Sequence, residues 1–159
     1  MTDHRLSAIR TTTPDVIATA VLTVETDGAG FTEITADAAR FVAETGARHG
    51  TLQLYLRHTS ASLVIQENAD PDVRTDLATA LDRLAPVDAD WVHQEEGPDD
   101  MPSHVKAMLT GISLQVPVID GELALGHWQG IFLAEHRTSR RRREVVLQFL
   151  GSQNVSRSR

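Results

Sequence analysis

The sequence contains no cysteine among its 159 residues. This absence excludes disulfide bonds, thiolate zinc sites and a cysteine nucleophile. The chain also lacks an apolar run long enough to span a bilayer, and no charged-then-apolar leader is visible. We therefore expect a soluble, cytoplasmic protein that does not bind membranes.

Positive charge is also scarce. The chain has 15 lysine and arginine residues against 22 aspartate and glutamate residues, which gives a net charge of −7. Binding to nucleic acid requires a broad basic surface that displaces counterions, so we expect no nucleic-acid partner. Because cysteine is absent, the seven histidines and the carboxylates are the remaining ligands for a transition metal.

The length suits a single domain, which we expect to span 1–159 with flexible ends at 1–15 and 152–159. Leu52, Leu54 and Leu56 alternate with polar residues, which is typical of a strand with one buried face. Other strands are expected over 16–24, 31–34, 63–65, 112–118, 123–125, 128–134 and 144–150. We expect the first two of these, 16–24 and 31–34, to form a hairpin around the glycines between them.

Helices are expected from Thr35 to Gly46, from Asp70 to Leu84 and from Met101 to Gly111. The predicted caps are the hydroxyl of Thr35 for the first helix and the carboxylate of Asp70 for the second. Together the elements predict an α+β domain, built on a mostly antiparallel sheet or two-sheet β-sandwich with inserted helices.

Three histidines are candidates for one metal site. His58 follows a strand, His93 lies in the long polar loop 85–101, and His104 is expected in the first turn of the next helix. Together they could hold a metal and leave its other positions open to water or substrate. A single histidine of this kind is more often a hydrogen-bonded structural residue, and the spacing matches no short metal motif.

Carboxylates and arginines offer further chemistry. Glu67, Asp70 and the acidic residues of loop 85–101 could supply a general base or oxygen ligands for a hard cation. The arginine run from Arg137 to Arg143 is a candidate phosphate clamp, although a solvated hairpin tip is the plainer interpretation. Trp128 could shape a pocket or belong to the core.

Four sequence blocks resemble the signature of the YjbQ family. They are HTSAS at 58–62, QENADP at 66–71, EGPDDMPSH at 96–104 and LGHWQGIFLAEHR at 125–137, in the family's order and separations. The resemblance covers roughly 16–151. It implies a YjbQ-like α+β fold on a β-sandwich, assembled as a homotrimer, with a metal-associated site lined by histidines.

The resemblance also implies roles for particular residues. His58, His93 and His104 become the expected metal ligands, with a divalent metal ion, Zn or Mg, as the cofactor. Glu67 and His104 become the expected catalytic acid–base groups. The expected substrate contacts are Ser60, Asp70, Trp128, Gln129, Arg137 and Arg140.

The family is commonly labelled secondary thiamine-phosphate synthase. That transferase joins a hydroxymethylpyrimidine diphosphate to a thiazole phosphate, so the first hypothesis is a metal-dependent enzyme acting on small phosphorylated molecules. A metal-assisted phosphate-ester hydrolase and a non-enzymatic metal- or ligand-binding trimer are the alternatives.

Overall fold

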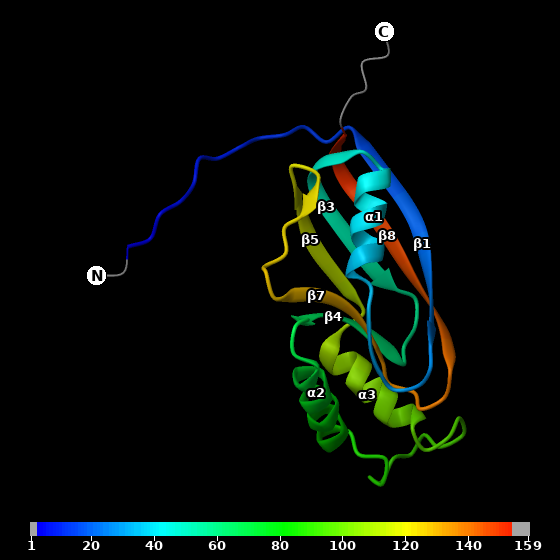
Figure 1. The fold of residues 1–159 in the computed structure, drawn as a ribbon. Coiled ribbons are helices and arrows are strands. Elements are labelled where there is room, and N and C mark those ends of the chain that lie inside the picture. Colours follow the sequence, from blue (N-terminus) through cyan, green and yellow to red (C-terminus); the bar gives the residue numbers. More distant parts are fainter. Residues whose placement is uncertain (1–2, 154–159) are drawn as a thin grey trace.

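The computed structural model of the chain describes residues 3–153, which form eight strands and three helices (Figure 1). The strands are β1 (Val16–Thr26), β2 (Gly30–Glu33), β3 (Ala47–Leu56), β4 (Ala61–Glu67), β5 (Ser113–Ile119), β6 (Glu122–Leu123), β7 (Gln129–Glu135) and β8 (Arg141–Gln153). The helices are α1 (Thr35–Glu44), α2 (Pro71–Leu84) and α3 (Asp100–Thr110). None of the described helices is both long enough and apolar enough to cross a membrane.

The strands form two antiparallel sheets. One has five strands in the order β1-β8-β3-β5-β6, and the other has three in the order β2-β7-β4. The expected α+β class with mostly antiparallel pairing is therefore confirmed. Helix α1 lies across the larger sheet, whereas α2 and α3 lie together beyond the smaller one (Figure 1).

The expected hairpin between the first two strands is wrong. Strand β1 pairs along its whole length with β8, while β2 pairs with β7 in the other sheet. Gly28 and Gly30 both adopt positive φ angles, a conformation that glycine reaches without strain. The turn therefore carries the chain from one sheet to the other instead of folding it back on itself.

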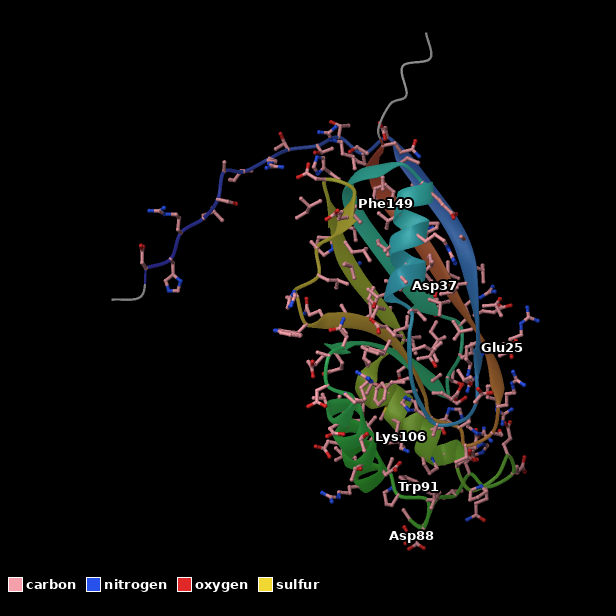
Figure 2. All side chains as sticks on the ribbon, in the orientation of Figure 1. Glu25, Asp37, Asp88, Trp91, Lys106 and Phe149 are labelled. Atoms are coloured by element: carbon pink, nitrogen blue, oxygen red, sulfur yellow. The ribbon has the colours of Figure 1, made fainter. Side chains whose placement is uncertain are left out.

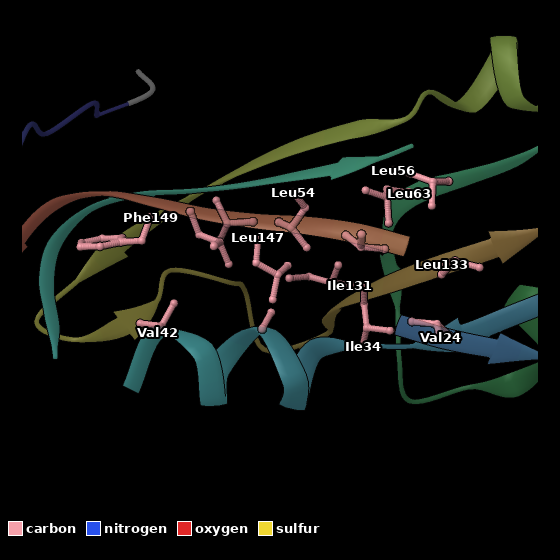
Figure 3. Close-up of a cluster of buried hydrophobic side chains, with 14 of the residues drawn as sticks. Val24, Ile34, Val42, Leu54, Leu56, Leu63, Ile131, Leu133, Leu147 and Phe149 are labelled. Atoms are coloured by element: carbon pink, nitrogen blue, oxygen red, sulfur yellow. The ribbon is translucent and has the colours of Figure 1, made fainter. Parts of the chain in front are cut away.

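The period-two pattern of β3 is confirmed, because its leucines are fully buried while Gln53 and Tyr55 are exposed. Leu52 and Leu54 lie beside Phe149 and Leu147 of the neighbouring strand β8. Together with Val42 of α1 they belong to one buried cluster, part of which Figure 3 shows. Apolar residues of β4 and β7 complete this core. The polar loops at the ends of these strands thus emerge from a closely packed scaffold.

Of the two predicted helix caps, one is confirmed. Asp70 caps α2 as expected, since its Oδ1 accepts a hydrogen bond from Asp72 N at 2.9 Å. Thr35 does not cap α1, which has Ile34 at the cap position. The Thr35 hydroxyl instead accepts a hydrogen bond from Ile131 N at 2.8 Å, which fixes α1 to β7.

The ends of the chain differ from each other. Residues 3–15 are exposed and form neither helix nor strand, and in Figure 1 they extend away from the body of the protein. Strand β8 continues to Gln153, two residues past the expected end of the last ordered segment. The remainder of the expected flexible ends, residues 1–2 and 154–159, lies outside the described residues.

Candidate metal-binding site

Three side chains that can each offer one ligand atom meet at the start of α3. His93, Asp100 and His104 place these atoms within 4.8 Å of one another. Asp100 Oδ2 lies 2.9 Å from His93 Nε2 and 3.2 Å from His104 Nε2. The structure therefore brings together two of the three expected histidines and adds a carboxylate.

The geometry of α3 accounts for two of these positions. The helix begins at Asp100, so His104 lies four residues into it and not in its first turn as expected. Residues four apart share one face of a helix, which aligns the carboxylate with the imidazole. His93 reaches the same point from the loop between α2 and α3, and its side chain is partly open to solvent.

Asp100 is held from its other side by Arg137. Nη1 of the arginine contacts Asp100 Oδ1, Nη2 donates to Glu96 O at 2.7 Å, and Nε lies 3.3 Å from Asp99 Oδ2. Both Arg137 and Asp100 are buried. Arg137 therefore orients the carboxylate and ties the loop to the end of β7.

The charge state of Asp100 follows from these contacts. Burial by itself raises the pKa of a carboxyl group. The hydrogen bond from His93 and the charges of Arg137 and the two histidines outweigh that effect, so the pKa of Asp100 is lowered. Asp100 is thus an anion that faces two imidazole rings.

His104 has its protonation pattern set by the backbone. Its Nδ1 lies 2.9 Å from Thr59 O, and because a carbonyl oxygen only accepts, Nδ1 must carry the hydrogen. A neutral ring then directs the Nε2 lone pair at Asp100 Oδ2. Either a second proton on the ring or a cation must separate these two atoms.

The donor set fits a transition-metal ion. Histidines that bind metals commonly donate their other ring N–H to a carbonyl, and metal-bound carboxylates are themselves hydrogen-bonded. His104 and Asp100 show both features. Two imidazole nitrogens and one carboxylate oxygen suit zinc better than magnesium, which prefers oxygen ligands, and three ligands leave a coordination position open.

Space for a small molecule adjoins the histidines. A cavity of about 290 Å³ is lined by His93 and by further residues of the same loop, which are Val87, Ala89, Trp91, Gln94, Gly97 and Pro98. The Trp91 indole is fixed in its wall, because Nε1 donates to Pro86 O at 2.8 Å. The loop 85–99, which carries the labelled residues Asp88 and Trp91 in Figure 2, thus lines the cavity that His93 borders.

His58 is not part of this group. Its Nε2 accepts a hydrogen bond from Glu144 N at 3.3 Å, and burial together with the nearby Arg143 charge lowers its pKa. The neighbouring Ser60 also has a structural contact, since its Oγ accepts from Arg143 Nη2 at 2.9 Å. Within one chain the side chains that come together are therefore two of the three expected histidines and Asp100, and the expected role of His58 as a metal ligand stays a prediction.

Four of the remaining expected site residues lie at the opposite end of the smaller sheet. Glu67 pairs with Gln129 at one end of the β4–β7 ladder, and Ala61 pairs with Glu135 at the other. The seven residues of β7 separate these ends by about 20 Å at ~3.4 Å per residue. Within one chain, Glu67, Asp70, Trp128 and Gln129 therefore lie far from the histidines.

Most of this second group already has local contacts. Glu67 Oε1 accepts from Ala69 N and Asp70 N, and Gln129 Oε1 accepts from Gly126 N. Trp128 is 59% exposed, so it is not a core residue. It remains available to contact something outside the chain.

The two expected phosphate contacts have different surroundings. Arg137 is buried and engaged with Asp100, so it holds that carboxylate, and its expected contact with phosphate stays a prediction. Arg140 is largely exposed and lies 3.4 Å from Asp27 Oδ1. Of the two, only Arg140 has its guanidinium open to solvent.

Asp100 was one of several carboxylates that the sequence offered for cation binding. The signal that distinguishes it is its four-residue spacing to His104 within a helix. This spacing becomes visible only when the helix is started at Asp100 and not at Met101.

Comparison with known proteins gives consistent matches. The family model described as UPF0047 protein YjbQ-like matches residues 20–152. A UPF0047 protein of Synechocystis is 43% identical over 132 residues, covering 82% of this chain and 90% of that protein. UPF0047 protein YjbQ of Salmonella typhimurium is 47% identical over 102 residues, and the match covers 64% of this chain and 74% of that protein.

Solved structures agree with the fold. An uncharacterized protein of the YjbQ/UPF0047 family from Clostridium acetobutylicum superposes with a TM-score of 0.77 at 34% identity, covering 82% of this chain and 98% of that one. A hypothetical protein from Aeropyrum pernix gives a TM-score of 0.79 at 28% identity, with coverage of 85% and 99%.

Proposed function

The chain belongs to the UPF0047 YjbQ-like family, and on this premise we propose that it is a metal-dependent enzyme acting on small phosphorylated substrates. The reaction that we propose is of the thiamine-phosphate synthase type, a group transfer between a pyrimidine diphosphate and a thiazole phosphate. The alternatives, a phosphate-ester hydrolase and a binding protein without turnover, are outcomes of the test below.

One observation carries the proposal. His104 presents Nε2 to Asp100 Oδ2 at 3.2 Å while Thr59 O fixes the proton on Nδ1, and His93 Nε2 approaches the same oxygen. With Nδ1 fixed as the donor, the close approach of Nε2 to the Asp100 carboxylate is stabilised by a positive charge between the two atoms, which a ring proton or a metal ion can supply, and we propose that a metal ion takes this place. His93, Asp100 and His104 would be the residues that hold it.

The proposed transfer defines what the site must do. A ring nitrogen of the thiazole forms a bond to the methylene carbon of the pyrimidine, and the bond from that carbon to the diphosphate oxygen breaks, releasing diphosphate. A bound divalent ion would supply positive charge at the leaving diphosphate. The residues of this chain orient the ion, exclude water from the loop cavity and contact the phosphate groups.

Residue roles follow from position. Arg137 holds Asp100 in place, and we propose Arg140 as the group that contacts phosphate because its guanidinium is exposed. Trp128 and Gln129 are proposed to contact the pyrimidine. Glu67 is proposed as the general base only for the hydrolase alternative, in which a water must lose a proton to Oε2 while Oε1 holds the following turn, because the transfer written above releases no proton.

The separation of these groups within one chain supports an assembly. We propose a homotrimer in which the Trp128 end of one subunit meets the His104 end of another, so that the site lies between subunits. We also propose that the two sheets stack as a β-sandwich within each subunit. An exposed tryptophan at one end and an open histidine pair at the other are the features that favour contact with a second copy.

The proposal is tested on the purified protein with both phosphorylated substrates, before and after chelation of metal. We expect formation of thiamine phosphate that is lost on chelation, is restored by zinc and is lost in His104→Ala. His4→Ala, at an exposed residue of the N-terminal segment, is the matched control and keeps activity. Hydrolysis of p-nitrophenyl phosphate without thiamine phosphate formation would favour the hydrolase, and metal binding with neither activity would favour the binding protein.

Mixing of variants tests the intersubunit site. His104→Ala and Trp128→Ala are each expected to be inactive alone. If they are unfolded and refolded together, sites that combine the intact end of each subunit should regain part of the activity. Recovery that never exceeds the sum of the separate proteins would place the site within one chain.

A further inference from the structure

A second cavity lies on the other side of α3. It measures about 210 Å³ and is lined by residues of α2, α3, the β1–β2 turn and the end of β7. Lys106 in its wall follows His104 by two residues, which is about 200° around the helix. The cavity is therefore separate from the candidate metal-binding site, and neither the proposed reaction nor the metal group uses it.

The cavity combines apolar walls with a buried cation. Phe31 and Leu81 are among its apolar lining residues, and Lys106, which is labelled in Figure 2, is only 7% exposed. Glu135 also lines the cavity, and both of its carboxylate oxygens accept hydrogen bonds from Arg143, which leaves Lys106 as the lining cation. The Lys106 ammonium contacts Asp82 Oδ1 at 2.6 Å, and the Asp82 side chain is 71% exposed. Among residues 3–153 the structure gives this ammonium no other acceptor.

The two partners of this ion pair differ in burial and in the number of hydrogen bonds that they satisfy. A lysine ammonium has three N–H donors, and Asp82 accepts from one of them. Asp82 is 71% exposed, so water can solvate its carboxylate when Lys106 contacts another anion, whereas the buried ammonium needs an anionic partner. A ligand anion that enters the cavity can therefore take its place beside Lys106.

His136 contributes an acceptor to the same cavity. Thr110 Oγ1 lies 2.7 Å from Lys106 O, and because that carbonyl only accepts, the threonine hydroxyl donates to it. Ser62 Oγ contacts Thr110 Oγ1 and must then donate to it. Ser62 Oγ is left to accept from His136 Nε2 at 2.6 Å, which places the ring hydrogen on Nε2.

The other ring nitrogen of His136 is then a free acceptor. Burial, reinforced by the Lys106 charge, lowers the pKa of His136 to about 4, so the ring is neutral near pH 7. Nδ1 therefore carries a lone pair, and the structure gives it no partner in the described part of the chain. His136 lines the cavity alongside Lys106.

We propose that this cavity binds a small organic anion that also carries a hydrogen-bond donor. Lys106 contacts the anionic group, His136 Nδ1 accepts from the donor, and Phe31 and Leu81 contact the apolar body of the ligand. The volume equals that of about seven water molecules at ~30 Å³ each, so the ligand is a compact ring or short chain.

Isosteric probes test the proposal on the full chain. Pyrrole-2-carboxylate and pyrrole-3-carboxylate supply an anion and an N–H donor at two spacings, and the corresponding furan carboxylates replace the N–H with an acceptor oxygen. Binding is measured by amide chemical shifts in NMR titrations. We expect at least one pyrrole carboxylate to bind with shifts centred on α3 and the end of β7, about fivefold tighter than its furan counterpart.

Two substitutions separate this site from a surface effect. Lys106→Met keeps the length of the side chain and is expected to weaken carboxylate binding about tenfold or more. Asp82→Asn removes the competing anion and is expected to strengthen binding several-fold, a gain that misfolding cannot produce. Asp76→Asn, at an exposed carboxylate on the same helix, is the matched control and leaves the affinity unchanged.

The outcomes are decisive in both directions. Stronger binding in Asp82→Asn together with preference for pyrrole over furan supports the site. Absence of binding by both pyrrole carboxylates at millimolar concentration, equal affinity for pyrrole and furan, or weaker binding in Asp82→Asn overturns it. None of these results depends on metal binding at His93, Asp100 and His104.

Discussion

Arg137 and Asp100 form a buried ion pair between the end of β7 and the start of α3. The arginine contacts Oδ1 and leaves Oδ2 to the two histidines. An arginine from the predicted phosphate clamp thus sets the direction of a carboxylate that the proposed metal site needs.

Loss of this arginine should weaken metal binding. In Arg137→Met the side chain still fills its space, but Asp100 is no longer held in place, and removal of such outer contacts lowers metal affinity about 10–100-fold. Zinc affinity is measured by competition with a chromophoric chelator.

Arg142→Met is the control for this substitution, because Arg142 is exposed and its guanidinium lies 4.0 Å from the exposed Glu25 Oε1. Equal zinc affinity in Arg137→Met and the wild-type protein would show that Arg137 has no positioning role.

His58→Asn should retain metal. Its ring accepts from Glu144 N and lies outside the group of His93, Asp100 and His104, so the metal content per chain is expected to stay at the wild-type level. Elemental analysis of the purified variant measures it. If His58→Asn lost as much metal as His104→Ala, His58 would be a metal ligand, as the sequence predicted.

Stability should fall on mild acidification because of His136. The pKa of this ring in the folded chain is lowered to about 4, whereas in the unfolded chain it has its ordinary value. Between these values the unfolded state binds a proton that the folded state does not, so stability decreases as pH falls from about 6.5 to about 4. The groups around the ring are Lys106, Glu135, Arg143 and Asp82.

The effect is measured by urea denaturation near pH 7 and near pH 5, where His136 accounts for a decrease of about 2 kcal/mol. His136→Gln should show a smaller decrease over the same interval. The same decrease in both proteins would assign the acid sensitivity to other groups.

Removal of Arg143 should destabilise the fold. Arg143 donates to both oxygens of Glu135 at 2.7 and 2.6 Å, and both side chains are buried. Arg143→Met leaves the Glu135 carboxylate without its cation, which costs about 3–5 kcal/mol. Chemical denaturation measures the loss, and a change no greater than that of Arg142→Met would contradict the assigned role of the pair.

The sequence predicted the local elements well because they depend on neighbouring residues. The alternating leucines of β3 and the Asp70 cap of α2 are examples, and both are confirmed. The hairpin between β1 and β2 failed because strand pairing is decided by distant segments. A partner 13 residues long, β8, occupies the whole of β1 and directs β2 to the other sheet.

In the candidate site, too, the sequence identified single residues, whereas their arrangement depends on the fold. His93 and His104 were identified from residue type, but the choice of Asp100 over Asp99 depends on where α3 begins. The burial of Arg137 could not be read from a run of arginines that otherwise looks like a solvated turn. The roles of Glu67, Ser60, Trp128 and Gln129 stay predictions, because they depend on the assembly of several chains.

The central claim is that His93, Asp100 and His104 share one cation. It is tested most directly by titrating the metal-free protein with cobalt(II) and recording its visible absorption, in the wild-type protein and in Asp100→Asn, which keeps the shape of the side chain. We expect one equivalent of tightly bound cobalt with the absorption of an imidazole-ligated ion in the wild-type protein, and loss of both in the variant. Identical titrations for the two proteins, or no cobalt uptake by the wild-type protein, would contradict the claim.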